Sequence, residues 1–285
     1  MDEGGLGVRR GRWRSWQVFR NNLKSLIMKI FNETVIQLNK EITLNFLNIE
    51  NYSDEFLQLI ENEIGFIRNG DLSDEDINDV KRRIKIWIDR KDKNKDDRAK
   101  NGFIAEFICH IYLRYTKFQQ YSLFKNLEER GPKKGFDGLY LLNDEMWLVE
   151  SKSTTVLKNT HKSEINKAFT DIKIKLESSE EDLDINDPWE NAKHHILIAK
   201  PDKTLIEKVK ILSTDFINNR KHKIKEYNIV PCSTIYLRDE FKEIDVEELK
   251  NKFEKLIHTN EAKKLNVICV NKKSKDDFIK YINNK

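Results

Sequence analysis

The sequence predicts an α/β protein with a mixed central sheet flanked by helices. Three observations predict this class: segments with apolar residues at helical spacing, two alternating segments joined by a tight turn, and short apolar runs that alternate with further helical segments in the C-terminal half. Of the 285 residues, 38% are hydrophobic and 35% are charged. The chain can therefore bury a substantial core under a heavily charged surface.

Positive charge is concentrated at the N-terminus. Seven basic residues and two acidic residues lie between Met1 and Ile30, whereas the whole chain has a formal net charge of +4. The arginines and tryptophans of "VRRGRWRSW" are suited to phosphate pairing and base stacking. A disordered tail, or an extension ahead of the true start, explains the same residues. We favour this second interpretation because the rest of the chain is rich in lysine and asparagine rather than arginine, and we assign residues 1–15 to a flexible basic arm.

Two amphipathic helices are predicted next, over residues 53–67 and 73–90. Their apolar residues recur at helical spacing, and each segment begins after a Ser or Asp suited to N-capping. We therefore expect residues 16–95 to form a mainly helical N-terminal region. The charge run "RKDKNKDDR" separates this region from a second one, residues 96–285.

A longer helix is predicted from Arg98 to Lys117. Its centre, "GFIAEFICHIYL", is apolar nearly all round, which indicates a helix buried on more than one side. Glu106 is the only acid in that centre. Glu106 can be an acidic residue of the kind favoured near a helix N-terminus, a core acid with a raised pKa, or a metal ligand. Its position beyond the first turn weakens the first of these interpretations.

A β-hairpin follows a loop that ends in "EERGPKKG". Alternating patterns predict strands over residues 137–142 and 146–153, and Asn143 and Asp144 suit a tight turn between them. The two strands are therefore expected to be antiparallel.

The pattern of the C-terminal half predicts alternating strands and helices. We predict a helix over residues 163–178. Short apolar runs predict strands over 194–200, 229–237 and 266–271, and helical spacing predicts helices over 203–219, 246–258 and 275–282.

The second hairpin strand sets two charges into an apolar run. One of its faces is expected to carry Met146, Leu148, Glu150 and Lys152. Ionised groups in a central strand cost several kcal/mol each unless they are paired or bind an ion. Taken alone, the pattern favours a structural explanation, in which Glu150 and Lys152 pair with each other or guard a sheet edge.

Asp137 shifts the interpretation toward a site. It lies at the start of the partner strand, opposite the end of the second strand, so it is expected near Glu150 and Lys152. Two carboxylates that converge in a partly desolvated place repel each other, and a hard divalent cation with oxygen ligands neutralises them. Mg²⁺, with Mn²⁺ as a substitute, fits better than zinc, which usually brings His or Cys.

These residues resemble the PD-(D/E)XK nuclease superfamily. Glu106 on a helix, Asp137 opening one strand, and Glu150, Ser151 and Lys152 on the next match its pattern over about residues 102–176, although Phe136 stands where that superfamily often has proline. The resemblance implies a restriction-endonuclease-like core.

The resemblance also implies a role for each residue. Asp137, Glu150 and the backbone carbonyl of Ser151 would hold Mg²⁺, and Glu106 would bind the metal through water or complete a second site. Lys152 would orient or help deprotonate the attacking water and stabilise the pentavalent phosphorus.

A narrower resemblance is to the HamA nuclease family of Hachiman anti-phage systems, on "AEF", "FDG" and "ESK". It implies a DNA endonuclease or nickase in bacterial defence, gated by a helicase partner, HamB. Two alternatives stay open: a stand-alone restriction endonuclease, and a catalytically silent nucleic-acid-binding subunit with the nuclease fold. The sequence leaves the oligomeric state open.

Other candidate sites are weaker. The three cysteines lie far apart in apolar runs without zinc spacing, which predicts small core residues in a reducing compartment. The Cys109–His110 pair reads as packing. His161 and Lys162 can contact phosphate, although a solvated loop is favoured there. No apolar stretch approaches the roughly 20 residues of a membrane span, and no signal peptide is visible, so a cytoplasmic protein is expected.

Overall fold

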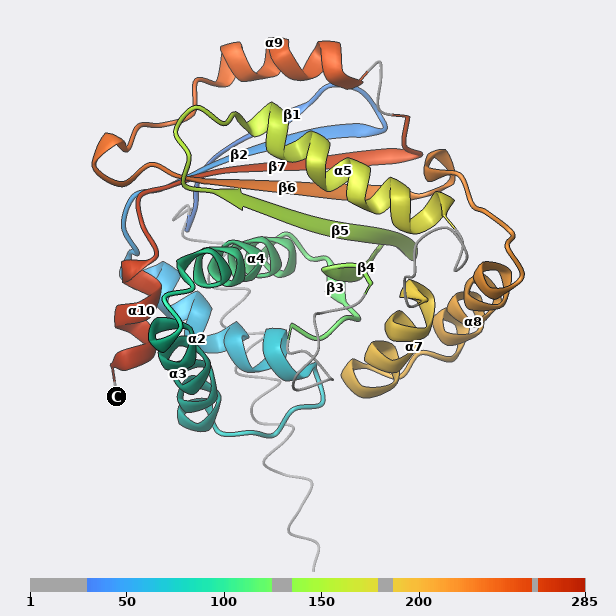
Figure 1. The fold of residues 1–285 in the computed structure, drawn as a ribbon, viewed down its shortest axis with the longest axis horizontal. Coiled ribbons are helices and arrows are strands. Elements are labelled where there is room, and N and C mark those ends of the chain that lie inside the picture. The colour runs from blue at the N-terminus through green and yellow to red at the C-terminus, as the bar shows by residue number, and fades with distance from the viewer. Residues whose placement is uncertain (1–29, 125–134, 179–186, 258–260, 285) are drawn as a thin grey trace, which may run out of the picture.

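The computed structural model describes residues 30–124, 135–178, 187–257 and 261–284. The predicted basic arm, residues 1–15, lies outside these ranges. Within them, helices cover both faces of one mixed sheet (Figure 1), which confirms the predicted α/β class.

The sheet contains seven strands in the order β1-β2-β7-β6-β5-β4-β3. The four strands β2, β7, β6 and β5 are parallel to one another. β1 pairs antiparallel with β2 at one edge, and β4 and β3 continue the sheet beyond β5 with antiparallel pairing at the other edge. The central strands are covered on both faces, so they are apolar along most of their length. The strands are β1 (Asn32–Gln37), β2 (Ile42–Ile49), β3 (Gln119–Gln120), β4 (Gly138–Leu142), β5 (Glu145–Thr154), β6 (Asn228–Tyr236) and β7 (Lys264–Lys272).

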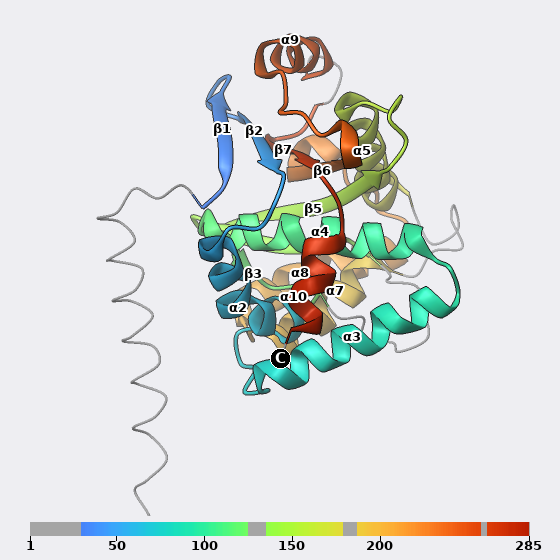
Figure 2. The same cartoon turned by 90° about the vertical axis from the view of Figure 1, so that its left-hand side faces the viewer.

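The helices form a layer on each side of the sheet, and Figure 2 shows α4 and α5 on opposite faces of it. One layer contains α2 (Asp54–Asn69), α3 (Ile77–Lys93), α4 (Asp97–Tyr115) and α10 (Asp276–Asn283). The other side is covered by α5 (His161–Glu177), α7 (Pro188–Ala199), α8 (Lys203–Ile217) and α9 (Val246–Ile257). Two single 3₁₀ turns, Ile224–Glu226 and Arg238–Glu240, flank β6.

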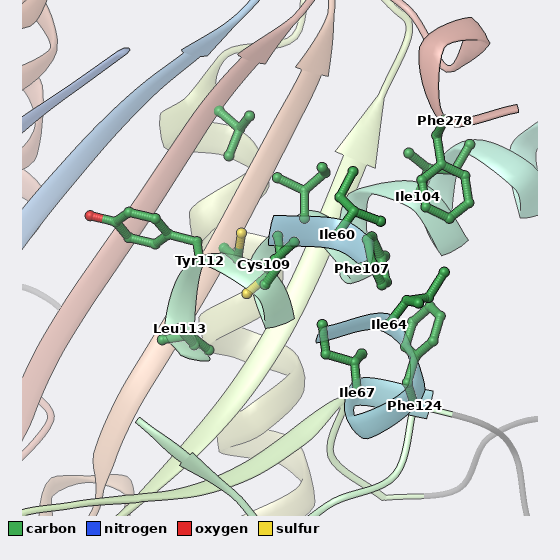
Figure 3. Close-up of a cluster of buried hydrophobic side chains, with 14 of the residues drawn as sticks. Ile60, Ile64, Ile67, Ile104, Phe107, Cys109, Tyr112, Leu113, Phe124 and Phe278 are labelled. Carbon is green, nitrogen blue, oxygen red and sulfur yellow. The ribbon is translucent and has the colours of Figure 1, made fainter. Parts of the chain in front are cut away.

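The core beneath the α4 face joins segments that are far apart in sequence. Figure 3 shows side chains of α2, α4 and α10 in contact, among them Ile60, Phe107 and Phe278, each of which is fully buried. Both faces of α4 contribute buried residues, as its apolar sequence predicts. Glu106 and His110 are therefore held in a helix whose position is set by packing on several sides.

The predicted hairpin is confirmed. β4 pairs with β5 in antiparallel register, and the connecting residues Asn143 and Asp144 have φ values of 51° and 62°. Two consecutive positive φ values are the signature of the two-residue turn whose twist matches the flanking strands.

The strand predicted over residues 194–200 is wrong, because this segment belongs to helix α7. The helix begins earlier than the apolar run: Asp187 caps it by accepting a hydrogen bond from the backbone of Trp189, and Pro188 occupies the first turn. Trp189, Ala192 and Ile196 then fall on one buried face. The short run "HHILIAK" looked strand-like only when it was separated from this start.

Two strands lie inside the region that the sequence predicts to be mainly helical. β1 and β2 form a hairpin, and β2 pairs in parallel with β7 from the far end of the chain. Leu44, Phe46 and Leu47 of β2 are fully buried. The strands β1 and β2 therefore belong to the same sheet that carries the charged strand.

None of the helices in the described ranges is long and apolar enough to cross a membrane.

Candidate active site

The β4–β5 hairpin brings the predicted site residues together. Gly138 pairs with Val149, so continuing the register places Asp137 opposite Glu150. The side-chain Oδ2 of Asp137 accepts a hydrogen bond of 2.8 Å from the backbone N–H of Ser151. Asp137 is thus tied to the residue between Glu150 and Lys152, as the hairpin geometry predicts.

The glycines around Asp137 are needed for this close approach. A Cβ at Gly138 would lie 2.8 Å from the ring of Tyr140 and 3.1 Å from the Cβ of Val149. Gly135 has a φ of 94°, in the region that favours glycine, and a Cβ there would meet the backbone of Pro188. Gly138 therefore lets β4 pack tightly at the point where Asp137 meets β5.

Alternation along β5 sends its side chains to the two layers. Trp147 and Val149 join the core under α4, whereas Met146 and Leu148 join the core under α5. Glu150 continues the second set, so its side chain and that of Lys152 lie on the α5 side of the sheet.

Glu150 is 3% exposed and both of its carboxylate oxygens are paired with lysines. Its Oε1 lies 2.9 Å from Nζ of Lys152, and its Oε2 lies 2.7 Å from Nζ of Lys175, on α5. Lys152 also forms an ion pair with Asp171, on the same helix. The cost of burying Glu150 is therefore offset by two cations. One belongs to the predicted Glu150–Lys152 pair, and the other belongs to a second pair, between Glu150 and Lys175.

These charges control the protonation of Lys152. Burial alone would lower its pKa, but the negative charge of Glu150, the hydrogen bond to Asp171 and the charge of Asp137 together raise the pKa above its ordinary value. Lys152 is consequently held as an ammonium ion across the physiological pH range.

Glu106 lies on the other side of the sheet, on α4. Its Oε1 is 3.4 Å from Nε2 of His110, and Nδ1 of His110 is hydrogen-bonded to the hydroxyl of Tyr140. The pKa of Cys109 is raised by its hydrogen bond to Cys232 and by burial, with smaller contributions that include the charges of Asp137 and Glu106. The charges of Asp137 and Glu106 therefore both act on Cys109.

The donors that converge on the hairpin are oxygens. Among the residues with described positions, no group of three or more His, Cys, Asp and Glu side chains is placed to hold a metal ion. The Oγ of Ser151 is buried and has no hydrogen-bond partner. Two carboxylates opposite each other in the β4–β5 register are a donor set suited to Mg²⁺, which uses one or two carboxylates and keeps waters, and unsuited to zinc.

Sequence reasoning missed Asp171 and Lys175. A signal for them exists, because Ile172 and Leu176 mark the buried side of α5, and Asp171 and Lys175 each precede one of these residues. Asp171 and Lys175 are four residues apart, so they lie on the same side of the helix. Since this helix is the next element after the strand that contains "ESK", the two side chains are placed to face that strand.

His161 is buried, not part of a solvated loop as we expected. It opens helix α5, where its Nδ1 is hydrogen-bonded to Ser233 and its Nε2 lies 2.9 Å from the side-chain oxygen of Asn271. Ser233 pairs with Lys152 in the β5–β6 register. His161 therefore anchors α5 to the strand beside the site.

The remaining candidates are structural. The three cysteines are free and buried, as predicted. His195 accepts a hydrogen bond from the backbone of Leu123, and His194 pairs with Glu190 one turn away on the same helix.

Comparison with known proteins adds one match. No curated protein matches the sequence. A family model described as HamA matches residues 27–285, which is most of the chain and includes the β4–β5 hairpin, α4 and α5. The chain therefore belongs to the HamA family.

Proposed function

We propose that this protein is a Mg²⁺-dependent DNA endonuclease or nickase and acts as the nuclease subunit of a Hachiman anti-phage defence system. Membership of the HamA family supports the role in a defence system. The proposed nuclease activity is supported by one observation: Asp137, Glu150 and Lys152 converge at the hairpin.

The proposed metal site uses the oxygen donors of the hairpin. Asp137, Glu150 and the backbone carbonyl of Ser151 would hold Mg²⁺. Bound there, the ion would neutralise charge on the phosphate oxygens and lower the pKa of a coordinated water. Glu106 would bind the metal through water or complete a second site, as the superfamily resemblance implies.

Lys152 has a defined part in this mechanism. Because its pKa is raised, it donates hydrogen bonds as an ammonium ion rather than accepting a proton from water. Its position one residue beyond Ser151 lets it stabilise the negative charge that develops on the phosphate oxygens. Of the two roles that the superfamily resemblance implies, stabilising the phosphate is therefore favoured over deprotonating the water.

The defence role includes a partner. A nuclease that cuts DNA without sequence recognition endangers its own cell, so its activity must be gated. We propose that a helicase subunit of the same system, HamB, supplies DNA to the site and controls it.

The test is cleavage of plasmid DNA by purified protein in Mg²⁺ or EDTA, with and without the helicase subunit. Wild type is compared with Asp137→Asn, Glu150→Gln and Lys152→Met, and with Glu190→Gln as a surface control. Cleavage that requires Mg²⁺ and all three hairpin residues supports the proposal. A wild-type protein that binds DNA but never cuts it would support the silent nucleic-acid-binding alternative.

A further inference from the structure

Helix α5 contributes two charges that complement the charged strand. Asp171 pairs with Lys152, and Lys175 pairs with Glu150. Lys152 and Glu150 also pair with each other, so the four side chains form one four-charge cluster, made of Glu150, Lys152, Asp171 and Lys175.

The two elements match in spacing. Four residues of a helix span about 6.0 Å, and two residues of a strand span about 6.6 Å. Because Asp171 faces Lys152 and Lys175 faces Glu150, the helix runs antiparallel to the strand at this point. Each charge on α5 can therefore meet its opposite on β5 without distortion of either element.

Lys175 holds one of the carboxylate oxygens that the proposed metal ion would use. Its Nζ lies 2.7 Å from Oε2 of Glu150, while Lys152 holds Oε1. Lys175 also lies over the ring of Phe136, with 5.9 Å from Nζ to the ring centroid, and Phe136 directly precedes Asp137. The ammonium group thus pairs with one oxygen of Glu150 and lies over the residue that precedes Asp137, the other carboxylate that is proposed to hold Mg²⁺.

We propose that Lys175 is a positioning residue that competes with the metal ion for Glu150. Without metal, Lys175 supplies a positive charge that pairs with the buried side chain of Glu150. When the ion binds, two cations cannot share one carboxylate oxygen at close range, so Lys175 must leave Oε2. The side chain is 20% exposed and long, which gives it room to move away. Lys175 therefore sets the metal concentration at which the site becomes occupied. This inference rests on the proposed metal site.

The test is the affinity of the DNA-free protein for Mn²⁺, measured by electron paramagnetic resonance or calorimetry, so that catalysis plays no part in the readout. Wild type is compared with Lys175→Met and with Lys173→Met, which removes an exposed lysine from the same helix. We expect Lys175→Met to bind Mn²⁺ roughly fivefold or more tightly than wild type, because one competing ion pair is lost. Lys173→Met is expected to bind as wild type does.

A second variant is expected to change the Mn²⁺ affinity in the opposite direction. Asp171→Asn removes the other anion that holds Lys152, so Lys152 is left to Glu150 alone and metal binding is expected to weaken. Circular dichroism and thermal melts show whether each variant is folded before titration. A purely structural role for Lys175 would change the melting temperature of Lys175→Met and leave its Mn²⁺ affinity unchanged.

The failures of the two proposals are distinguishable. If wild type binds Mn²⁺, Asp137→Asn abolishes the binding, and Lys175→Met matches Lys173→Met, the competition is refuted and the metal site stands. If no variant binds Mn²⁺, both the competition and the metal site are refuted. Binding that appears or strengthens only in Lys175→Met supports the competition directly.

Discussion

At the scale of single residues, the hairpin shows how a buried acid is paired with cations. Glu150 lies in a strand that is buried on both faces, yet each of its oxygens has an ammonium partner. The same arrangement raises the pKa of Lys152 above its ordinary value. In the proposed mechanism, Lys152 therefore stabilises charge rather than transferring a proton.

Replacing Lys152 by Met tests this role. Since Lys152 is proposed to stabilise charge in the transition state, Lys152→Met is expected to lower the cleavage rate by about 10²–10³-fold. The rate is measured on plasmid DNA at saturating Mg²⁺. Lys158→Met, which removes an exposed lysine from the loop after β5, is the control and should cut at the wild-type rate. Equal rates for the two variants would remove Lys152 from the mechanism.

Gly138 allows a second prediction, on stability. Gly138→Ala is expected to destabilise the protein by about 1–3 kcal/mol, because the new methyl group would overlap the ring of Tyr140. Gly102→Ala is the matched control: it lies within α4 with no atom near the new Cβ, so it should raise stability by about 0.5–1 kcal/mol. Urea denaturation of both variants measures the difference. A Gly138→Ala protein as stable as wild type would show that β4 does not pack as closely as described.

At the scale of elements, α5 holds the site strand from one side. In its first turn, His161 forms hydrogen bonds with Ser233 and Asn271. In its later turns, Asp171 and Lys175 form ion pairs with Lys152 and Glu150. The helix that carries these ion-pair partners of β5 is therefore anchored to β6 and β7 at its start.

His161 predicts a pH dependence of stability. Burial lowers the pKa of His161 to about 4, partly opposed by its hydrogen bond to Asn271, whereas the unfolded chain has a value near 6.5. Between these two values the unfolded state binds the proton and the folded state does not. The contribution of His161 is thus fully present above about pH 6.5 and is lost as the pH falls toward 4, by up to ~1.4 kcal/mol per pH unit.

The measurement is the free energy of unfolding between pH 7 and pH 4.5. His161→Gln is expected to be less stable at neutral pH but to lose less stability on acidification than wild type. His194→Gln, at an exposed position on α7, serves as the control and should keep the wild-type slope. If the slope of His161→Gln equals that of wild type, His161 is not held neutral in the fold.

The sequence predicts local features well and long-range ones poorly. The hairpin, α4 and α5 are predicted from periodicity and turn residues, and "ESK" identifies Glu150 and Lys152. The pairing of β2 with β7 joins residues more than 200 positions apart, and periodicity contains no information about such partners. Lys175 was missed for the same reason, because its role depends on which strand α5 covers. The segment 194–200 was assigned wrongly because a short apolar run fits both a strand and a buried helix.

At the scale of the whole molecule, one sheet unites both ends of the chain. β2 and β7 lie side by side, and the run of parallel strands continues from β7 through β6 to β5. The residues of β1 and β2 are therefore part of the scaffold of the site.

Phe46→Ala tests this integration. Phe46 is fully buried between β2 and the α5 layer, so the substitution is expected to cost about 3–5 kcal/mol of folding stability. Val35→Ala, at an exposed position on β1, should change stability by less than about 0.5 kcal/mol. Thermal denaturation compares the two, and a small effect of Phe46→Ala would show that β2 is not part of the core.

The most direct measurement of the proposed activity is a Mg²⁺ titration of plasmid cleavage by wild type and Glu150→Gln, each alone and with the helicase subunit. Glu150→Gln keeps the shape of the side chain and removes the charge that is proposed to hold the metal. We predict that wild type cuts only with Mg²⁺ and that Glu150→Gln is at least about 100-fold slower. Cleavage that persists in EDTA, equal rates for the two proteins, or no cleavage under any of these conditions would contradict a metal-dependent nuclease centred on Glu150.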